Sequence, residues 1–213
     1  MKKQLDLTLY LILDPLLCGG ISGMVNTTKI AVSNGATAVQ LRSEHKFSGK
    51  DWYYAALALK EALNETPVPL FINDHVDIAL AVDADGVHIG QSDLPVDATR
   101  QLIGRDKWLG FSIANRRQLD SVPWHKVDYI GIGPILPTAT KKGAAVALGT
   151  EQLIELIELK QCPAVAIGGI DENNVTNVIQ TGIDGVAVVS AICGKQDIEQ
   201  ATLSLITQIK KAK

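Results

Sequence analysis

The sequence is poor in cysteine, and this excludes two common ways of stabilising a fold. Its 213 residues contain three cysteines, Cys18, Cys162 and Cys193, and none of them has the C-x-x-C spacing of zinc and redox sites. An odd number of widely spaced cysteines argues against a disulfide framework. We therefore expect reduced, mostly buried thiols and a hydrophobic core, which a chain of this length can build.

Long apolar runs and basic tracts are also missing. Near the N-terminus the unbroken apolar stretch runs only from Leu9 to Leu13, which is too short for a signal peptide or a membrane span. The chain has 20 basic and 23 acidic residues, a formal net charge of −3. We therefore expect a cytoplasmic protein that binds neither nucleic acid nor membrane, so that any affinity for phosphate must come from local positive charge.

What the sequence does contain is a regular alternation of short apolar runs and longer amphipathic segments. Runs such as Ala-Val-Ala-Ile at 164–167 are typical of parallel strands that are covered on both faces. The predicted strands are 8–14, 37–42, 69–73, 86–89, 108–112, 129–133, 164–168 and 185–189. The predicted helices are 23–34, 49–64, 75–82, 96–103, 116–122, 150–160, 172–181 and 197–211.

Eight strand-then-helix units in succession predict a closed (β/α)8 barrel that occupies residues 1–213 as a single domain. An open doubly wound sheet is the alternative. It more often has fewer strands and a G-x-G-x-x-G sequence after the first strand, and the sequence after residue 14 lacks that pattern. No linker or low-complexity tract interrupts the alternation, which favours the barrel.

Polar residues follow the predicted strands, at the end where barrels carry their active sites. Asp74 and Asp93 follow neighbouring strands, and two carboxylates this close repel unless a proton or a cation lies between them. Magnesium is usually held by one or two carboxylates together with substrate phosphate. The alternative for Asp74 is that it caps the following helix. His88 lies within a strand pattern and is expected to be a core histidine rather than a ligand.

Two loops have the composition of phosphate sites. The long loop after the sixth strand, 134–143, combines hydroxyls with two lysines, a set that binds anions. Gly168-Gly169 and Val189-Ser190 end the seventh and eighth strands, where barrels often bind phosphate at a helix N-terminus. Solvated lysines and ordinary turn glycines are the plainer explanations. Two such sites in one barrel predict two phosphorylated substrates.

The ordered set of strand-end motifs resembles the thiamine-phosphate synthase family over nearly the whole chain. The motifs, as they stand here, are Tyr10-Leu-Ile-Leu-Asp14-Pro15, Gln40-Leu41-Arg42, Asn73-Asp74, His88-Ile-Gly-Gln-Ser-Asp93, Gly110-Phe-Ser112, Gly133-Pro-Ile-Leu-Pro-Thr138-Ala-Thr140-Lys141 and Ala166-Ile-Gly-Gly169-Ile. The resemblance implies a transferase that joins a hydroxymethylpyrimidine diphosphate to a thiazole phosphate and releases diphosphate.

The resemblance also implies a role for each matching residue. Arg42, Ser112 and Lys141 would act in catalysis, and Asp74 and Asp93 would hold Mg²⁺. The residues implied to contact the pyrimidine diphosphate are Gln40, Leu41, Arg42, Ser43, Glu44, Asn73, Ser112 and Lys141. Those implied to contact the thiazole phosphate are Thr138, Ala139, Thr140, Gly169, Val189 and Ser190. A homo-oligomer is also considered.

The sequence departs from the family pattern at several positions. The family usually has lysine where this chain has Glu44, with Lys46 two residues further, and it often has histidine where this chain has Ala114. Two alternatives therefore stay open. One is a thiazole tautomerase-like barrel, although those relatives tend to lack the paired acids and to carry a histidine near position 134, where this chain has proline. The other is a barrel that binds a phosphorylated ligand without turnover.

Overall fold

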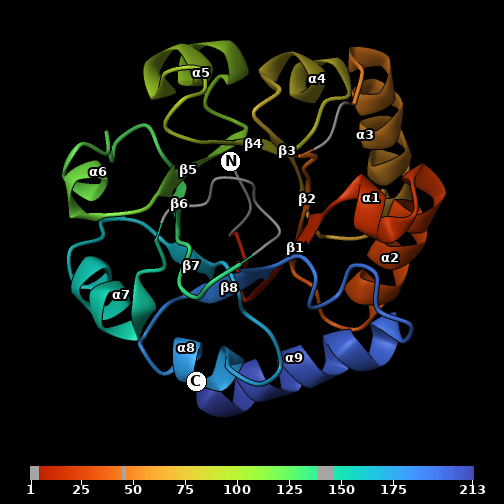
Figure 1. Ribbon diagram of the computed structural model, residues 1–213. Coiled ribbons are helices and arrows are strands. Elements are labelled where there is room, and N and C mark those ends of the chain that lie inside the picture. The colour runs from red at the N-terminus through yellow and green to blue at the C-terminus, as the bar shows by residue number, and fades with distance from the viewer. Residues whose placement is uncertain (1–4, 45–46, 139–145) are drawn as a thin grey trace.

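The computed structural model describes residues 5–44, 47–138 and 146–213. It is a closed barrel of parallel strands in the order β1 to β8, in which β1 also pairs with β8 (Figure 1). The strands are β1 (Leu9–Leu13), β2 (Ala38–Leu41), β3 (Leu70–Asn73), β4 (Gly86–Ile89), β5 (Trp108–Ile113), β6 (Tyr129–Ile132), β7 (Ala164–Ile167) and β8 (Gly185–Val188). The predicted barrel is confirmed, and each predicted strand is found with ends that agree to within one residue.

Helices surround the barrel as a ring (Figure 1). They are α1 (Pro15–Cys18), α2 (Ile21–Ser33), α3 (Gly49–Leu63), α4 (Val76–Ala81), α5 (Val96–Ile103), α6 (Arg116–Asp120), α7 (Gly149–Ile157), α8 (Val175–Ile179) and α9 (Ile198–Ala212). None of the described helices is long and apolar enough to cross a membrane.

The sequence analysis did not predict α1. The Asp14 carboxylate accepts hydrogen bonds from the amides of Leu16 and Leu17, and Gly19 ends the helix with a φ of 76°. Proline at the first helical position and glycine in the left-handed conformation at the end are the usual helix boundaries. A helix of four residues has no hydrophobic periodicity to detect, so only its two end signals could have indicated it.

Two separate hydrophobic clusters hold the fold together. The larger one lies between the strands and the surrounding helices, and the smaller one fills the inside of the barrel. The interior cluster contains three aromatic residues, with Phe71 lying 5.4 Å from both Tyr10 and Tyr129 between ring centroids. The barrel is therefore a packed core rather than a pore, as expected for eight strands. The three cysteines are free thiols, and Cys193 is buried.

Candidate active site

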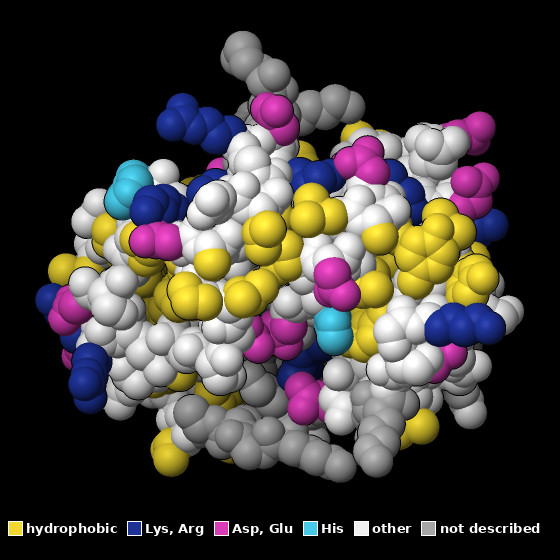
Figure 2. All heavy atoms as spheres, turned by 90° about the horizontal axis from the view of Figure 1, so that it is seen from above, with side chains coloured by type: hydrophobic (Ala, Val, Ile, Leu, Met, Phe, Trp, Pro, Cys, Tyr) yellow, Lys and Arg dark blue, Asp and Glu magenta, His cyan; other side chains and the backbone are white. Residues whose placement is uncertain are grey.

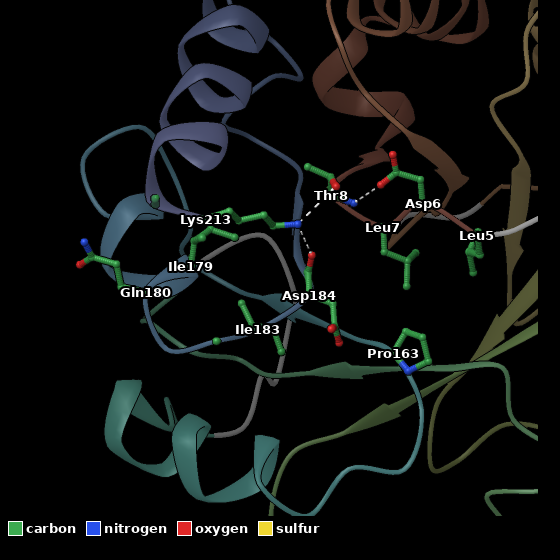
Figure 3. Close-up of a pocket in the computed structure, with 12 residues that line it drawn as sticks. Leu5, Asp6, Leu7, Thr8, Pro163, Ile179, Gln180, Ile183, Asp184 and Lys213 are labelled. Atoms are coloured by element: carbon green, nitrogen blue, oxygen red, sulfur yellow. Dashed lines mark hydrogen bonds between the residues drawn. The ribbon is translucent and has the colours of Figure 1, made fainter.

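The two ends of the barrel differ in what they present. At the end where the strands begin, a pocket lies between the segment before β1 and the ends of α8 and α9 (Figure 3). Lys213 reaches across it and donates to the Asp184 carbonyl at 2.7 Å. None of the residues that the sequence analysis placed in the site lines this pocket. Those that the structure describes lie at the opposite end, where the strands finish.

Gln40 and Leu41 are consecutive residues of β2, and their side chains point to opposite sides. Gln40 is 1% exposed and donates from Nε2 to the Tyr10 hydroxyl at 2.8 Å, inside the barrel. Leu41 is fully buried in the outer cluster, between the strands and the helices. Leu41 was predicted to contact the substrate, but its side chain is buried, so only its backbone could make that contact.

Arg42 follows β2, and its guanidinium forms an ion pair with the Glu44 carboxylate. Burial lowers the pKa of Arg42, while the negative charges of Asp74 and Asp14 act in the opposite direction. Asp74 and Asp14 are thus near enough to Arg42 for their charges to act on the guanidinium. Three residues of the predicted site, Arg42, Glu44 and Asp74, therefore lie near one another in the structure. The Glu44 carboxylate points toward Arg42. Lys46, the proposed substitute for the family lysine, lies outside the described residues.

The two predicted metal ligands follow the adjacent strands β3 and β4. Asp74 has a left-handed backbone with a φ of 60°, and its amide donates to the His88 carbonyl at 2.9 Å. His75 occupies the N-cap of α4, so Asp74 lies one residue before the cap. The Asp93 carboxylate accepts from the Gly90 amide at 2.7 Å through one oxygen. A carboxylate has about four acceptor positions, so this bond leaves capacity for a cation.

A cation at this place would need ligands from more than the side chains. Among the residues that the structure describes, no group of three or more His, Cys, Asp or Glu side chains is arranged to hold a metal ion. Hard carboxylate oxygens are nevertheless the donors that Mg²⁺ prefers, and it usually completes its shell with water and substrate phosphate. The pair therefore fits a magnesium ion that arrives with a phosphorylated substrate.

Ser112 lies near the end of β5, half-buried, and its hydroxyl lies 2.8 Å from His88 Nε2. His88 is 8% exposed, and its other ring nitrogen lies 2.9 Å from the Tyr129 hydroxyl. This places His88 in the barrel interior, as the sequence analysis expected. The contacts of His88 with Tyr129, and of Tyr129 with Tyr10, were not predicted from the sequence. Their signal in the sequence is weak, because a tyrosine in an apolar strand usually indicates core packing.

The loops after β6 and β7 are held together beyond the ends of their strands. Ile135 and Leu136 donate their amides to the carbonyls of Ile167 and Gly168 at 2.9 and 3.0 Å. Gly169 has a φ of 68°, and a β-carbon there would lie only 2.6 Å from the Pro137 carbonyl oxygen. Only glycine fits this position, for both reasons.

The predicted thiazole-phosphate residues come from three neighbouring strands. Thr138 follows directly on the segment that packs against Gly169. Val189 is half-buried and Ser190 is exposed at the end of β8, and the Val189 carbonyl accepts from the Cys193 amide at 2.8 Å. Ala139, Thr140 and Lys141 lie outside the described residues, so their predicted roles stay predictions.

Comparison with known proteins identifies the family. The sequence model described as thiamine monophosphate synthase matches residues 9–192. The chain belongs to this family. It is 46% identical over 205 residues to the thiamine-phosphate synthase of Laribacter hongkongensis, an alignment that covers 96% of each protein. It is 45% identical over 211 residues to that of Psychrobacter sp., with 97% of this chain and 98% of the relative covered.

Solved structures agree. Thiamine phosphate pyrophosphorylase from Pyrococcus furiosus superimposes with a TM-score of 0.86 at 33% identity over 98% of both chains. The predicted family is thus confirmed, and so is the assignment as an enzyme, a transferase of the class whose known reaction is the coupling described above. A structure titled native KDPGal has a TM-score of 0.74 at 16% identity, which shows only that the barrel fold is shared.

Proposed function

We propose that this chain couples 4-amino-5-hydroxymethyl-2-methylpyrimidine diphosphate to thiazole phosphate, giving thiamine phosphate and diphosphate. One observation carries the proposal beyond family membership. Arg42 with the nearby acidic residues Glu44 and Asp74, and the loops that follow β6, β7 and β8, lie at the same end of the barrel. The first group suits a diphosphate with its cation, and the second suits a phosphate monoester.

The pyrimidine diphosphate would lie over β2 to β5. We assign its contacts to the side chains of Gln40, Arg42, Ser43, Glu44, Asn73, Ser112 and Lys141, and to the backbone of Leu41. A guanidinium binds diphosphate oxygens in pairs and stays charged, so Arg42 is the principal anchor. Glu44 would compete with the diphosphate for the guanidinium, because its carboxylate already forms an ion pair with Arg42.

Asp74 and Asp93 would hold Mg²⁺ together with the diphosphate. The ion, when bound, neutralises charge on the leaving group and so makes its departure easier. The backbone of Asp74 is anchored to β4 by the bond to His88, and the Asp93 carboxylate is held by the Gly90 amide. The Asp93 carboxylate and the backbone that carries Asp74 are thus held in place before a substrate binds, which lowers the entropic cost of assembling the site.

The thiazole phosphate would lie over β6 to β8. Its phosphate would accept hydrogen bonds from the hydroxyls of Thr138, Thr140 and Ser190 and from backbone amides at Ala139, Gly169 and Val189. Left-handed glycine exposes its amide to an anion without a side chain in the way. The backbone bonds between the β6 and β7 loops fix the spacing of these donors.

The reaction needs placement and charge stabilisation rather than a protein nucleophile. The bond between the pyrimidine methylene carbon and the diphosphate oxygen breaks, and its electron pair leaves with diphosphate. Arg42 and Lys141 stabilise the charge that develops there, while the pyrimidine ring stabilises the cation. The lone pair of the thiazole nitrogen then forms the new carbon–nitrogen bond, and holding both substrates together makes this step effectively unimolecular.

The test is a coupling assay with and without Mg²⁺, in which thiamine phosphate and diphosphate are measured. Asp93→Asn removes the charge but keeps an oxygen for the Gly90 amide, and we expect Mg²⁺-dependent turnover to fall on the order of 100-fold. Asp97→Asn is the matched control, since Asp97 is an exposed carboxylate that pairs with Lys126. A protein that binds thiazole phosphate but forms no product would contradict the proposal and favour a binding barrel.

The tautomerase-like alternative gains no support from the site. It needs no metal, whereas this chain has acidic residues after both β3 and β4, and it has Pro134 where those relatives tend to carry histidine. Isomerisation of a thiazole substrate without pyrimidine diphosphate or Mg²⁺ would be the result that revives it.

A homo-oligomer and a cytoplasmic location stay predictions. Figure 2 shows hydrophobic side chains gathered across the side of the molecule that carries α3, α4 and α5. Exposed leucines there include Leu57, Leu80 and Leu102, with 43%, 40% and 54% of their surface accessible. Exposed apolar side chains gathered on one side of a molecule support self-association. Size-exclusion chromatography over a range of protein concentrations, with Leu80→Glu as a disrupting variant, tests it.

A further inference from the structure

A chain of hydrogen bonds runs through the inside of the barrel from β2 to β5. Gln40 Nε2 lies 2.8 Å from the Tyr10 hydroxyl, which lies 2.9 Å from the Tyr129 hydroxyl. The Tyr129 hydroxyl lies 2.9 Å from His88 Nδ1, and His88 Nε2 lies 2.8 Å from Ser112 Oγ. We call these residues the interior relay. Its two ends, Gln40 and Ser112, are residues that the proposed function places on the pyrimidine diphosphate.

The relay has a direction that follows from its first member. The Gln40 amide nitrogen can only donate, so the Tyr10 hydroxyl accepts from it and donates its own proton to Tyr129. Tyr129 in turn donates to His88 Nδ1, which must then be the unprotonated nitrogen of the neutral ring. His88 therefore carries its proton on Nε2 and donates it to Ser112 Oγ. The Ser112 proton is left to donate outward.

The surrounding strands make room for the relay by lacking side chains. A β-carbon at Gly110 would lie 2.2 Å from Tyr129 Cζ and 2.4 Å from His88 Nδ1, distances that real atoms do not adopt. A β-carbon at Gly131 would lie 3.2 Å from His88 Cε1. Neither glycine is among those with a positive φ, so the backbone conformation does not require glycine there. Glycine at these positions provides space for the contact between Tyr129 and His88.

Packing alone does not account for these polar groups. The relay shares the barrel interior with the apolar cluster around Phe71, and aliphatic side chains of similar size would fill the same space. Buried hydroxyls and a buried imidazole must all be paired to avoid a loss of stability, and among the described residues every buried side-chain nitrogen or oxygen has a partner. A fully satisfied network of this kind fixes the orientation of its members.

We propose that Tyr10, Tyr129 and His88 are positioning residues that keep His88 in the Nε2–H form and so oblige Ser112 to act as a hydrogen-bond donor to the pyrimidine diphosphate. This inference rests on the proposed function, in which Ser112 touches that substrate. The relay favours a substrate that presents a hydrogen-bond acceptor to Ser112. The ring nitrogens of the pyrimidine and the oxygens of the diphosphate are both acceptors. A substrate with a donor group at that place would have to use the second lone pair of Ser112 Oγ and turn the hydroxyl proton away from itself.

Steady-state kinetics of Tyr129→Phe provide the first test. The variant removes the hydroxyl that selects the histidine tautomer, and we expect kcat/KM for the pyrimidine diphosphate to fall about 3- to 10-fold, the range of one neutral hydrogen bond. The KM for thiazole phosphate should not change. Tyr10→Phe should have a smaller effect, because Tyr129 can still donate to His88. Ser112→Ala removes the hydroxyl that would donate to the pyrimidine diphosphate, so it should also lower kcat/KM for that substrate.

A double-mutant cycle separates positioning from structural damage. In a Ser112→Ala background, Tyr129→Phe should cause no further loss of kcat/KM, because the group that it orients is gone. Phe71→Leu is the control, since Phe71 packs against both tyrosine rings but has no hydrogen-bonding group. An equal loss from Tyr129→Phe in both backgrounds, or the same kinetic pattern from Phe71→Leu, overturns the proposal.

The second test does not depend on the reaction. Nitrogen NMR of histidine-labelled protein distinguishes the two neutral tautomers, and the chain has four histidines, so the His88→Gln variant identifies the signal. We expect the Nε2–H form for His88 in the wild type and a changed tautomer population in Tyr129→Phe. The Nδ1–H form in the wild type refutes the inference even if coupling is observed. Failure of the wild type to couple, with the Nε2–H form present, refutes the proposed function instead.

Discussion

Gly110→Ala is a substitution for which the structure predicts a large cost from a single methyl group. The new β-carbon would lie 2.2 Å from Tyr129 Cζ and 2.4 Å from both the Tyr129 hydroxyl and His88 Nδ1. Unbonded carbons approach to about 3.5 Å, so the ring or the strand must move by more than about 1 Å. Tyr129 is fully buried, so no solvent space is available for that movement.

Two effects add to give the magnitude. Overpacking a core costs about 1–3 kcal/mol. Separating Tyr129 from His88 leaves a buried polar group unpaired, which costs about 1–3 kcal/mol more. We therefore expect the free energy of unfolding to fall by about 2–6 kcal/mol, a large share of the ~5–15 kcal/mol typical of a domain.

Urea unfolding followed by circular dichroism measures this loss. Gly49→Ala is the matched control, because Gly49 lies in α3 without a positive φ and a β-carbon there meets nothing within 4 Å. It should leave the stability unchanged or raise it by about 0.4–1 kcal/mol. A loss below about 1 kcal/mol in Gly110→Ala, or an equal loss in the control, would show that the interior is less tightly packed than we infer.

Three further predictions concern charge. Burial raises the pKa values of Tyr10 and Tyr129 above the usual 10.0, so they stabilise the fold fully below about pH 10 and this stability is lost as the pH rises further. Each pH unit above 10 should lower the free energy of unfolding by about 1.4 kcal/mol per tyrosine, which urea titrations at several alkaline pH values measure. Burial raises the pKa of the Cys162 thiol to about 12, whereas a hydrogen bond with a neighbouring thiol lowers that of Cys18. Mass spectrometry after brief alkylation at about pH 8 should therefore find Cys18 modified before Cys162. Glu44→Lys removes the carboxylate next to the Arg42 guanidinium and adds a positive charge. The KM for the pyrimidine diphosphate should therefore fall several-fold at low salt and less at high salt. An unchanged KM at low salt would contradict this prediction.

The sequence was most informative where the physical signal was local and repeated. The strands were predicted because short apolar runs recur between amphipathic segments, and the strand ends located the candidate residues. Asp14 shows the limit of this reasoning. It is the last residue of a predicted strand, yet its carboxylate caps α1, a helix that the sequence analysis did not predict. Its charge also acts on Arg42 at the same end of the barrel.

The interior relay could not be predicted from the sequence. Its members belong to separate strands, and Tyr10 and Tyr129 are 119 positions apart. Hydrogen bonds across the inside of a barrel depend on which residues of each strand face inward and on their relative height, that is, on the register of all the strands together. Arg42 and Glu44, in contrast, are two residues apart, yet their ion pair was also not predicted, because a loop conformation decides whether two nearby charges meet.

The left-handed backbone of Asp74 limits which amino acids can replace it. Most side chains clash with the chain at a φ of 60°, whereas asparagine and aspartate adopt it with less strain. The substitution Asp74→Asn should therefore keep the shape of the loop and change only its charge, while Asp74→Ala would alter both. The backbone therefore restricts this position to very few amino acids, before metal chemistry is considered. The restriction applies to evolutionary variation and to any redesign of the cation specificity of the barrel.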